Sequence, residues 1–142
     1  MRHFLALEEN HTRRVVQLVD ALYSCGRDPG NTILLENESI SRHHAILMRV
    51  PMSAMDIRYR IMDGNMTGTP SLNGITVNGL RCSSHDLEDG DEIVFAGVIT
   101  ARYYRRPLSD QEFRDATELV VRRSIRLDPV DNVSTVLLEP QG

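Results

Sequence analysis

Short runs of apolar residues, separated by residues that favour turns, recur from residue 4 to residue 104 of the chain. The clearest turn signal is Asn78-Gly79, which lies between apolar residues, because both tolerate the positive φ of a type I′ hairpin turn. Residues 56–63 alternate apolar and polar side chains, which is the period of a half-buried strand. Further strands are expected at residues 4–7, 12–19, 23–25, 32–35, 44–50, 75–82, 92–96 and 99–104. Many short strands with turns between them predict an all-β chain, and in particular a β-sandwich.

The pattern changes after Pro107. Ser109 and Glu112 have the spacing of a capping box, in which each residue satisfies a backbone N–H at the start of a helix. Apolar residues follow at helical spacing, and Asp128-Pro129 ends any helix. The sequence therefore predicts three segments, which are a β-sandwich domain at residues 1–106, a helical extension at 107–127 and a flexible tail at 128–142.

Composition narrows the functional classes. The chain has 142 residues, of which 41% are hydrophobic, which suits one domain with one core. The net charge of −4 gives no general attraction to nucleic acid or anionic membranes. No apolar run approaches the roughly 18 residues of a membrane span, and Glu8-Glu9 interrupts the N-terminal apolar run too early for a signal peptide. We expect a cytoplasmic protein that neither binds nucleic acid nor inserts into a membrane.

Three separated pieces of the chain place polar residues at strand ends or turns. They are Gly26-Arg27, residues 41–44 and residues 71–79. Arginine offers a planar fork of donors that suits phosphate, and an asparagine amide can both donate to and accept from a peptide backbone. These loops therefore predict a receptor for an anionic peptide.

A catalytic site and a metal site are the two alternatives to a peptide receptor. Ser41 and His44 lie three residues apart, as a nucleophile and its base could, but no acid is placed to orient the histidine and Gly-x-Ser-x-Gly is absent. A histidine that enters a core strand more often fixes a loop through its two ring nitrogens. The metal candidates lack a Cys-x-x-Cys or His-Glu-x-x-His motif, and they are Cys25, Cys82, His43, His44 and His85. We expect no metal and no cofactor, and a disulfide between the two cysteines stays open.

Taken together, the three pieces resemble the forkhead-associated (FHA) domain, which reads as Gly-Arg, then Ser-x-x-His, then Ser-x-Asn-Gly-Thr followed by Val-Asn-Gly. The matching residues here are Gly26-Arg27, Ser41-Arg42-His43-His44 and Ser71-Leu72-Asn73-Gly74-Ile75-Thr76-Val77-Asn78-Gly79. Each piece alone is a weak signal, whereas all three in this order are specific. The resemblance covers most of residues 2–104. It implies a β-sandwich of about eleven strands, with a phosphothreonine-peptide site on loops at one end.

The resemblance also implies roles for single residues. Arg27 and Ser41 would hold the phosphate, and Arg42 could add to that grip. Asn73 would bond the peptide backbone next to the phosphothreonine, and Ser39 lies where the family often selects the residue three positions after it. The residues that would shape the site without touching the ligand are Gly26, His44, Gly74, Asn78 and Gly79.

Three departures from the family pattern bear on the site. Leu72 stands where many members carry a threonine that also contacts the phosphate, so that contact is missing. Ile75 replaces a threonine after Asn73-Gly74, which indicates a change in packing. Residues 64–70 form a longer loop than is usual in the family, and because it borders the site it could alter peptide choice or gate access.

The sequence thus predicts a phosphothreonine-binding adaptor in signalling or assembly, not an enzyme, whose partner is a phosphothreonine-containing protein. The alternative is a scaffold module of the same fold that binds without phosphate. A second copy of the chain is also considered as a partner, through residues 107–142. Within the tail, Thr135 has Leu138 three residues after it and could become a ligand for the site once phosphorylated.

Overall fold

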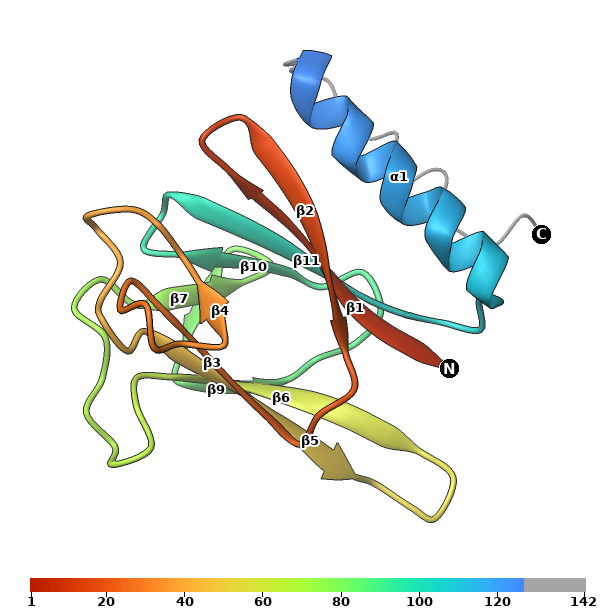
Figure 1. The fold of residues 1–142 in the computed structure, drawn as a ribbon. Helices are drawn as coiled ribbons and strands as arrows, with labels where there is room; N and C mark the ends of the chain where they lie inside the picture. The colour runs from red at the N-terminus through yellow and green to blue at the C-terminus, as the bar shows by residue number, and fades with distance from the viewer. Residues whose placement is uncertain (127–142) are drawn as a thin grey trace.

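In the part of the chain that the computed structural model describes, residues 1–126, eleven strands form two sheets that pack face to face (Figure 1). Side chains are described as far as residue 122. The first sheet holds, in spatial order, β2 (Thr12–Leu18), β1 (Arg2–Glu9), β11 (Ile99–Arg106), β10 (Glu92–Phe95), β7 (Ile75–Val77) and β8 (Leu80–Cys82). The second sheet holds β4 (Ile33–Leu34), β3 (Leu22–Gly26), β5 (Ala45–Pro51), β6 (Ile57–Asp63) and β9 (Ser84–Asp86). The predicted β-sandwich is confirmed.

The structure corrects two details of the strand prediction. The strand β9 was not expected, because its polar sequence carries no apolar alternation, yet it pairs with β6 through Arg60 and Asp86. The strand β5 does not stop before Pro51 but ends on it, a position where the missing N–H breaks no central ladder. Its partner Ile57 is 40% exposed, since this pair lies beyond Met48, the last residue of β5 that pairs with β3.

The core lies between the two sheets and is built by the inward side chains of the central strands. It includes residues that are at most 1% exposed, among them Leu5, Leu7, Leu47, Ile61, Ile93 and Tyr103. The period of two along each strand sends these side chains to one face. Full burial of each such aliphatic side chain stabilises the fold by about 1.5–3 kcal/mol. This core holds the strand ends, and therefore the loops at each end of the sandwich, in fixed positions.

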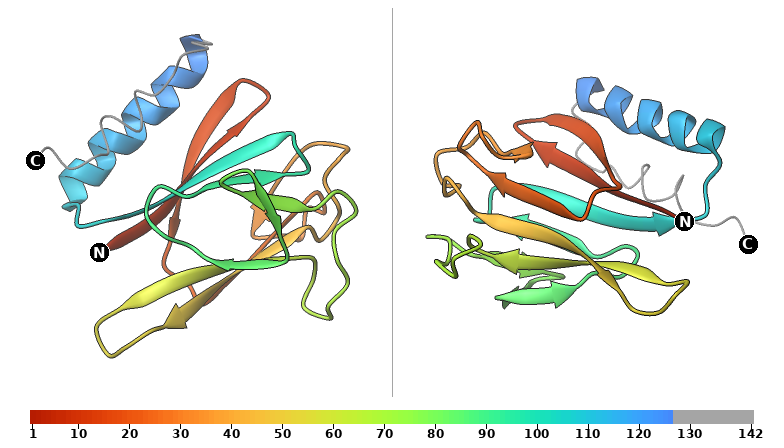
Figure 2. Two further views of the ribbon diagram at one scale, coloured as in Figure 1. Left: turned by 180° about the vertical axis from the view of Figure 1, so that it is seen from behind. Right: turned by 60° about the horizontal axis from the view of Figure 1, so that its bottom comes forward.

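The helix α1 (Asp110–Arg126) covers the outer face of the first sheet (Figure 2). The ring of Phe4 on β1 stacks on Tyr104 of β11, with centroids 5.2 Å apart, and Phe113 of the helix meets Phe4 edge-on at 5.1 Å. The capping box is confirmed, because the Ser109 N–H donates to Glu112 at 2.9 Å and the Glu112 N–H donates to the Ser109 hydroxyl at 3.1 Å. These bonds also hold the pKa of the Glu112 carboxyl below its ordinary value.

The hairpin turn expected between β7 and β8 is present. Asn78 and Gly79 both have positive φ, 52° and 83°, as a type I′ turn requires. A second turn of this kind joins β10 to β11, where Ala96 and Gly97 have φ of 55° and 70°. Within the described part of the chain, no helix is long and apolar enough to cross a membrane. Residues 127–142, with Thr135 and Leu138, lie outside the described residues.

Candidate functional site

Three loops lie together at one end of the sandwich, on the left of Figure 1, and carry the residues singled out from the sequence. The first follows β3, the second precedes β5 and the third joins β6 to β7. Direct hydrogen bonds connect the second loop to each of the others. Residues that are far apart in the sequence therefore form a single surface.

Gly26 allows the first two loops to approach each other at their backbones. A Cβ atom at this position would stand 2.1 Å from the carbonyl oxygen of Arg42, which no side chain could tolerate. The approach is held by a bond of 3.0 Å from the Arg27 N–H to the Ser41 carbonyl and by one of 2.6 Å from the Asn31 side-chain amide to the Arg42 carbonyl. Gly26 and Asn31 thus bring Arg27, Ser41 and Arg42 onto one rim. The role of Asn31 was not foreseen, although its place in the Asp-Pro-Gly-Asn turn was a signal for it.

His44 ties the second loop to the third from a fully buried position. Its Nδ1 accepts the Ser41 N–H at 2.9 Å, so Nε2 carries the hydrogen and donates to the Gly74 carbonyl, also at 2.9 Å. Both ring nitrogens are therefore committed to backbone groups, and neither is directed at the Ser41 hydroxyl. The arrangement positions loops and offers no nucleophile–base pair.

The hydroxyl of Ser41 is oriented by the third loop. Its Oγ accepts the Leu72 N–H at 2.9 Å, which leaves the hydroxyl hydrogen to be donated to another acceptor. The Leu72 side chain is 83% exposed, so this residue contributes its backbone N–H to the site and no hydroxyl. Ser41 is therefore placed as a hydrogen-bond donor on the surface of the site.

The side chain of Asn73 is also oriented, by a bond of 2.9 Å from its Nδ2 to the Ser39 carbonyl. Ser39 is held in turn by its N–H, which donates to the Asn37 side chain at 2.9 Å. The carbonyl oxygen of the Asn73 amide is left to accept a hydrogen bond from an incoming peptide. Ser39 thus contributes its carbonyl to the positioning of Asn73.

Three arginines at this end of the molecule have no carboxylate partner among the described residues, namely Arg27, Arg42 and Arg81. The Nε of Arg27 donates to the Ile40 carbonyl at 3.0 Å, which fixes the guanidinium and leaves its two terminal nitrogens available. Arg42 and Arg81 are exposed and make no side-chain hydrogen bond to the described residues. Unpaired guanidinium groups retain their capacity to bind an anion.

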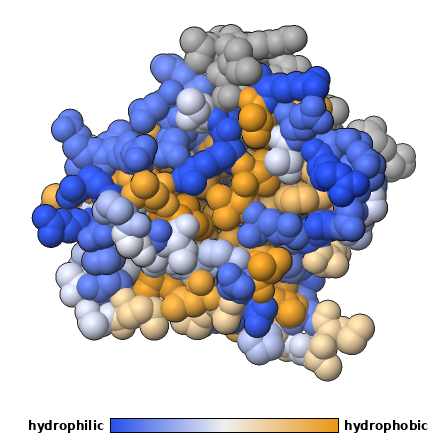
Figure 3. Space-filling view, in the orientation of Figure 1, coloured by the Kyte–Doolittle hydropathy of each residue, from blue (hydrophilic) through white to orange (hydrophobic). Residues whose placement is uncertain are grey.

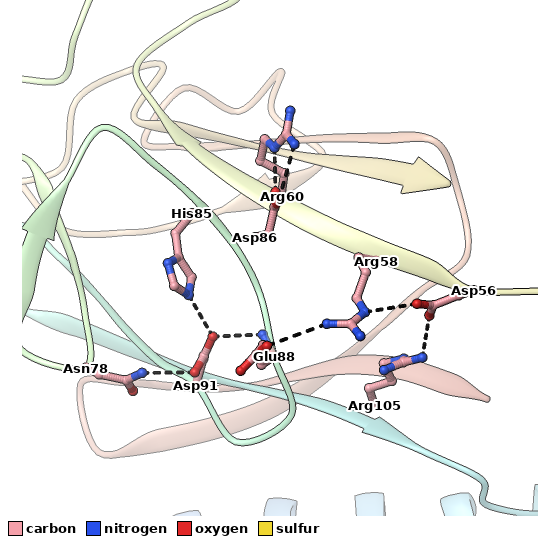
Figure 4. Close-up of polar contacts among 9 residues, drawn as sticks. All are labelled: Asp56, Arg58, Arg60, Asn78, His85, Asp86, Glu88, Asp91 and Arg105. Atoms are coloured by element: carbon pink, nitrogen blue, oxygen red, sulfur yellow. Dashed lines mark hydrogen bonds and ion pairs between the residues drawn. The ribbon is translucent and has the colours of Figure 1, made fainter. Parts of the chain in front are cut away.

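Arginines elsewhere are largely neutralised by carboxylates. Arg58 lies 3.5 Å from Asp56 and 3.7 Å from Glu88, and Arg105 also pairs with Asp56 (Figure 4). On β6, Arg60 pairs with Asp86 and lowers the pKa of that carboxyl through a hydrogen bond. The concentration of unpaired positive charge at the loop end is thus a local feature of a chain that is acidic overall.

The longer third loop is organised by its own side chains. The Oδ1 atom of Asn65 accepts the N–H groups of Thr67 and Thr69 at 3.0 and 2.9 Å. The Ser71 hydroxyl donates to Asp63 at the end of β6 and accepts the Gly74 N–H at 2.9 Å. These contacts were not predicted, although Asn and Ser are the residue types that bond to nearby backbone groups in turns.

The remaining sequence candidates lie elsewhere or have other partners. Asn78 bonds to Asp91 and Glu92 and so fixes the β7–β8 turn, while His43 is exposed. Cys25 and Cys82 are free thiols, so no disulfide joins them, and burial raises the pKa of Cys25 to about 12. In the described part of the chain, no three His, Cys, Asp or Glu side chains are grouped so that they could hold a metal ion.

The other end of the sandwich carries a hollow of about 320 Å³, whose lining includes Met1, His3, Val19, Met55 and Tyr59. Hydrophobic residues are visible across the centre of the face that Figure 3 shows, with hydrophilic residues on both sides. The hollow shares no residue with the three loops. It is therefore separate from the site that they form.

The fold and the loops define a class of protein, a two-sheet β-sandwich that presents oriented serine, asparagine and arginine side chains at one end. The sequence model of the FHA domain matches residues 23–96, and the chain belongs to this family. The Slr1951 protein of Synechocystis sp. has a crystal structure that is 36% identical and covers 73% of this chain and 98% of its own, with a TM-score of 0.69.

Two further relatives extend the comparison. EmbR of Mycobacterium tuberculosis, solved in complex with a low affinity phosphopeptide, is 27% identical, with a TM-score of 0.58, over 75% of this chain and 25% of EmbR. The uncharacterized protein sll1895 of Synechocystis sp. is 33% identical over 112 residues, which are 79% of this chain. The match spans only 16% of sll1895, so that relative is a much longer protein.

Proposed function

We propose that this protein binds phosphothreonine-containing segments of partner proteins and acts as an adaptor, without catalysing a reaction. One observation carries the proposal. The hydroxyl of Ser41 accepts the Leu72 N–H, so its own hydrogen is available as a donor on the same rim as the unpaired guanidinium groups of Arg27 and Arg42. A hydroxyl donor beside two arginines suits a dianionic, three-oxygen acceptor.

The chemistry of a phosphate explains why these groups act together. A phosphothreonine carries about −1.5 to −2 charges near neutral pH and three strong acceptor oxygens. Arg27, held by the Ile40 carbonyl, can present its two terminal nitrogens at little entropic cost. The Asn73 amide, held by the Ser39 carbonyl, is free to bond the peptide backbone beside the phosphothreonine. Phosphate and peptide are thus recognised by different side chains of one surface.

The partners follow from the same charges. The chain is acidic overall, so an anionic ligand is attracted only by the loop end. Because its net charge is −4, the chain as a whole does not attract nucleic acid. We propose a cytoplasmic setting, in which protein kinases supply the ligand and the two free thiols remain reduced.

The division into a sandwich, a helical extension and a tail remains part of this proposal, as does self-association through residues 107–142.

The alternative is a scaffold of the same fold that binds its partner without phosphate. EmbR, which is 27% identical to this chain, has been solved in complex with a phosphopeptide, and this supports phosphate-dependent binding over the scaffold. The decisive experiment is calorimetry with a degenerate phosphothreonine peptide library and the same library without phosphate. Binding of the phosphorylated library alone supports the adaptor, whereas equal binding of the two libraries would establish the scaffold.

A further inference from the structure

Arg81 lies next to the site but has no role in the interactions described above. It belongs to β8, where it pairs across the hairpin with Thr76 of β7. Its guanidinium reaches back over Gly74, so that a Cβ atom at position 74 would stand 2.7 Å from the Arg81 Cζ and Nη2 atoms. The arginine therefore ends beside the loop that carries Asn73.

The backbone explains how Arg81 comes to lie there. From the level of Thr76 to that of Gly74 is two residues, about 7 Å along a strand, which an extended arginine side chain can span. Gly74 has φ of 76° and no Cβ, and both properties leave its outer surface open to the guanidinium. The contact is thus a consequence of the hairpin register and of the glycine that follows Asn73.

The guanidinium is exposed, and it forms no hydrogen bond or ion pair with the described residues. By contrast, Arg60 and Arg102 on strands of the same sandwich are paired with Asp86 and Glu92. Asn73 is bonded on one side to Ser39 and adjoins Gly74 on the other. Arg81 therefore lies beside the backbone of Gly74, directly after Asn73, the residue that would hold a bound peptide.

We propose that Arg81 forms a second anion subsite, which binds the carboxylate of an aspartate or glutamate near the phosphothreonine of the same ligand. This inference rests on the proposed function and adds a sequence preference to it. An extended peptide that is held by its phosphate and by Asn73 places neighbouring side chains at intervals of about 3.3 Å. A carboxylate there would meet a guanidinium that has no competing partner in the part of the chain that the structure describes. An exposed pair of this kind changes affinity by up to about fivefold.

The test is a set of phosphothreonine peptides in which one glutamate is moved through each position of an alanine background. Affinities are measured by fluorescence anisotropy for the wild type, for R81Q and for R114Q. Arg114 lies on the helix α1 and, among the described residues, bonds only to Gln111, so R114Q removes the same charge far from the site. Melting temperatures of all variants show whether folding is unchanged.

We expect the wild type and R114Q to prefer glutamate at one flanking position by about two- to fivefold. R81Q should lose this preference while it binds the all-alanine peptide as tightly as the wild type does. R81K, which keeps the charge but not the planar fork, should retain part of the preference.

Three results would overturn the inference. The first is that R81Q keeps the glutamate preference. The second is that R81Q binds every peptide more weakly by the same factor, because Arg81 holds the phosphate itself. The third is that the wild type shows no glutamate preference at any position. In each of these cases phosphate-dependent binding, and with it the proposed function, would stand. If the wild type bound phosphorylated and plain peptides equally, the proposed function would fail first.

Discussion

At the scale of single residues, the loop end separates those that hold the fold from those that remain available to a ligand. His44 is fully buried and bonds to backbone on both sides, whereas Arg27 and Asn73 are exposed and keep free donors or acceptors. The two kinds alternate along the same short segments of chain. Substitutions at neighbouring positions should therefore affect either stability or binding, and rarely both.

Arg27→Ala should fold normally and lose about 2–5 kcal/mol of phosphopeptide binding, the usual cost of removing one partner of a desolvated charge pair. Ser41→Ala removes one donor to a charged acceptor, so the expected loss is smaller, about 1–3 kcal/mol. Titration calorimetry with one tight phosphopeptide measures both losses. Unchanged binding by Arg27→Ala would show that the phosphate is held elsewhere.

His44→Ala should lower the free energy of unfolding by about 2–4 kcal/mol, because it leaves a buried Gly74 carbonyl and the Ser41 N–H without their partner and opens a cavity. His43→Ala is the matched control. His43 is exposed, so its loss should fall within about 0.5 kcal/mol. Chemical denaturation of the two variants measures the difference, and a larger loss for His43 would contradict the assignment.

At the scale of elements, α1 completes the first sheet by covering Phe4 and Tyr104 on its outer face. Without the helix, two aromatic rings of β1 and β11 would meet solvent. The capping box fixes the start of the helix at Ser109, and the chain between β11 and that point is short. The helix is therefore a packed part of the structure, although it lies outside residues 23–96, which the FHA domain model matches.

Phe113→Ala tests this packing. Because Phe113 is half-buried against Phe4, we expect a loss of about 1–3 kcal/mol in the free energy of unfolding, less than for a fully buried ring. Arg114→Ala, an exposed change one residue along, should cost about 0.5 kcal/mol or less. Equal small losses in urea denaturation would mean that the helix contributes little to stability. Phosphopeptide affinity should be unchanged in both variants, because the helix lies away from the loops.

At the scale of the whole molecule, the two sheets meet at a buried histidine near the end opposite the site. His3 of β1 lies edge-on to Tyr59 of the other sheet, at 5.4 Å, and its Nδ1 lies 2.5 Å from the Tyr103 hydroxyl. Burial lowers the pKa of His3 below 6.5, and the positive charge of Arg105 lowers it further. The fold therefore favours the neutral ring more than the unfolded chain does.

The lowered pKa of His3 makes the stability of the fold depend on pH. The unfolded chain takes up a proton at His3 at a higher pH than the folded protein does, so the contribution of His3 is complete above pH 6.5 and is lost as the pH falls below it. His3→Gln keeps a polar side chain without this titration. Between pH 7.5 and pH 5.5, the melting temperature of the wild type should fall further than that of the variant. An equal fall in both proteins would contradict the link.

The sequence by itself determined the all-β class, the helix after residue 107 and the residues of the three loops. These are local properties, since turn residues, capping residues and the period of two act over a few neighbours. The strand β9 escaped prediction for the same reason, because its polar side chains carry no local signal and it is a strand only through pairing with β6. Ile57 is exposed although it shares a face of β6 with the buried Tyr59, because its burial depends on where the neighbouring strand ends.

The tertiary structure alone decided which groups at the site are committed and which are free. No spacing in the sequence shows that both ring nitrogens of His44 form hydrogen bonds to backbone groups, or that the Leu72 N–H orients the Ser41 hydroxyl. Nor does it show that the Arg81 guanidinium lies over Gly74. Each of these contacts joins residues brought together by the packing of two sheets. Their distances and directions depend on that packing, because a hydrogen bond requires both partners in place at once.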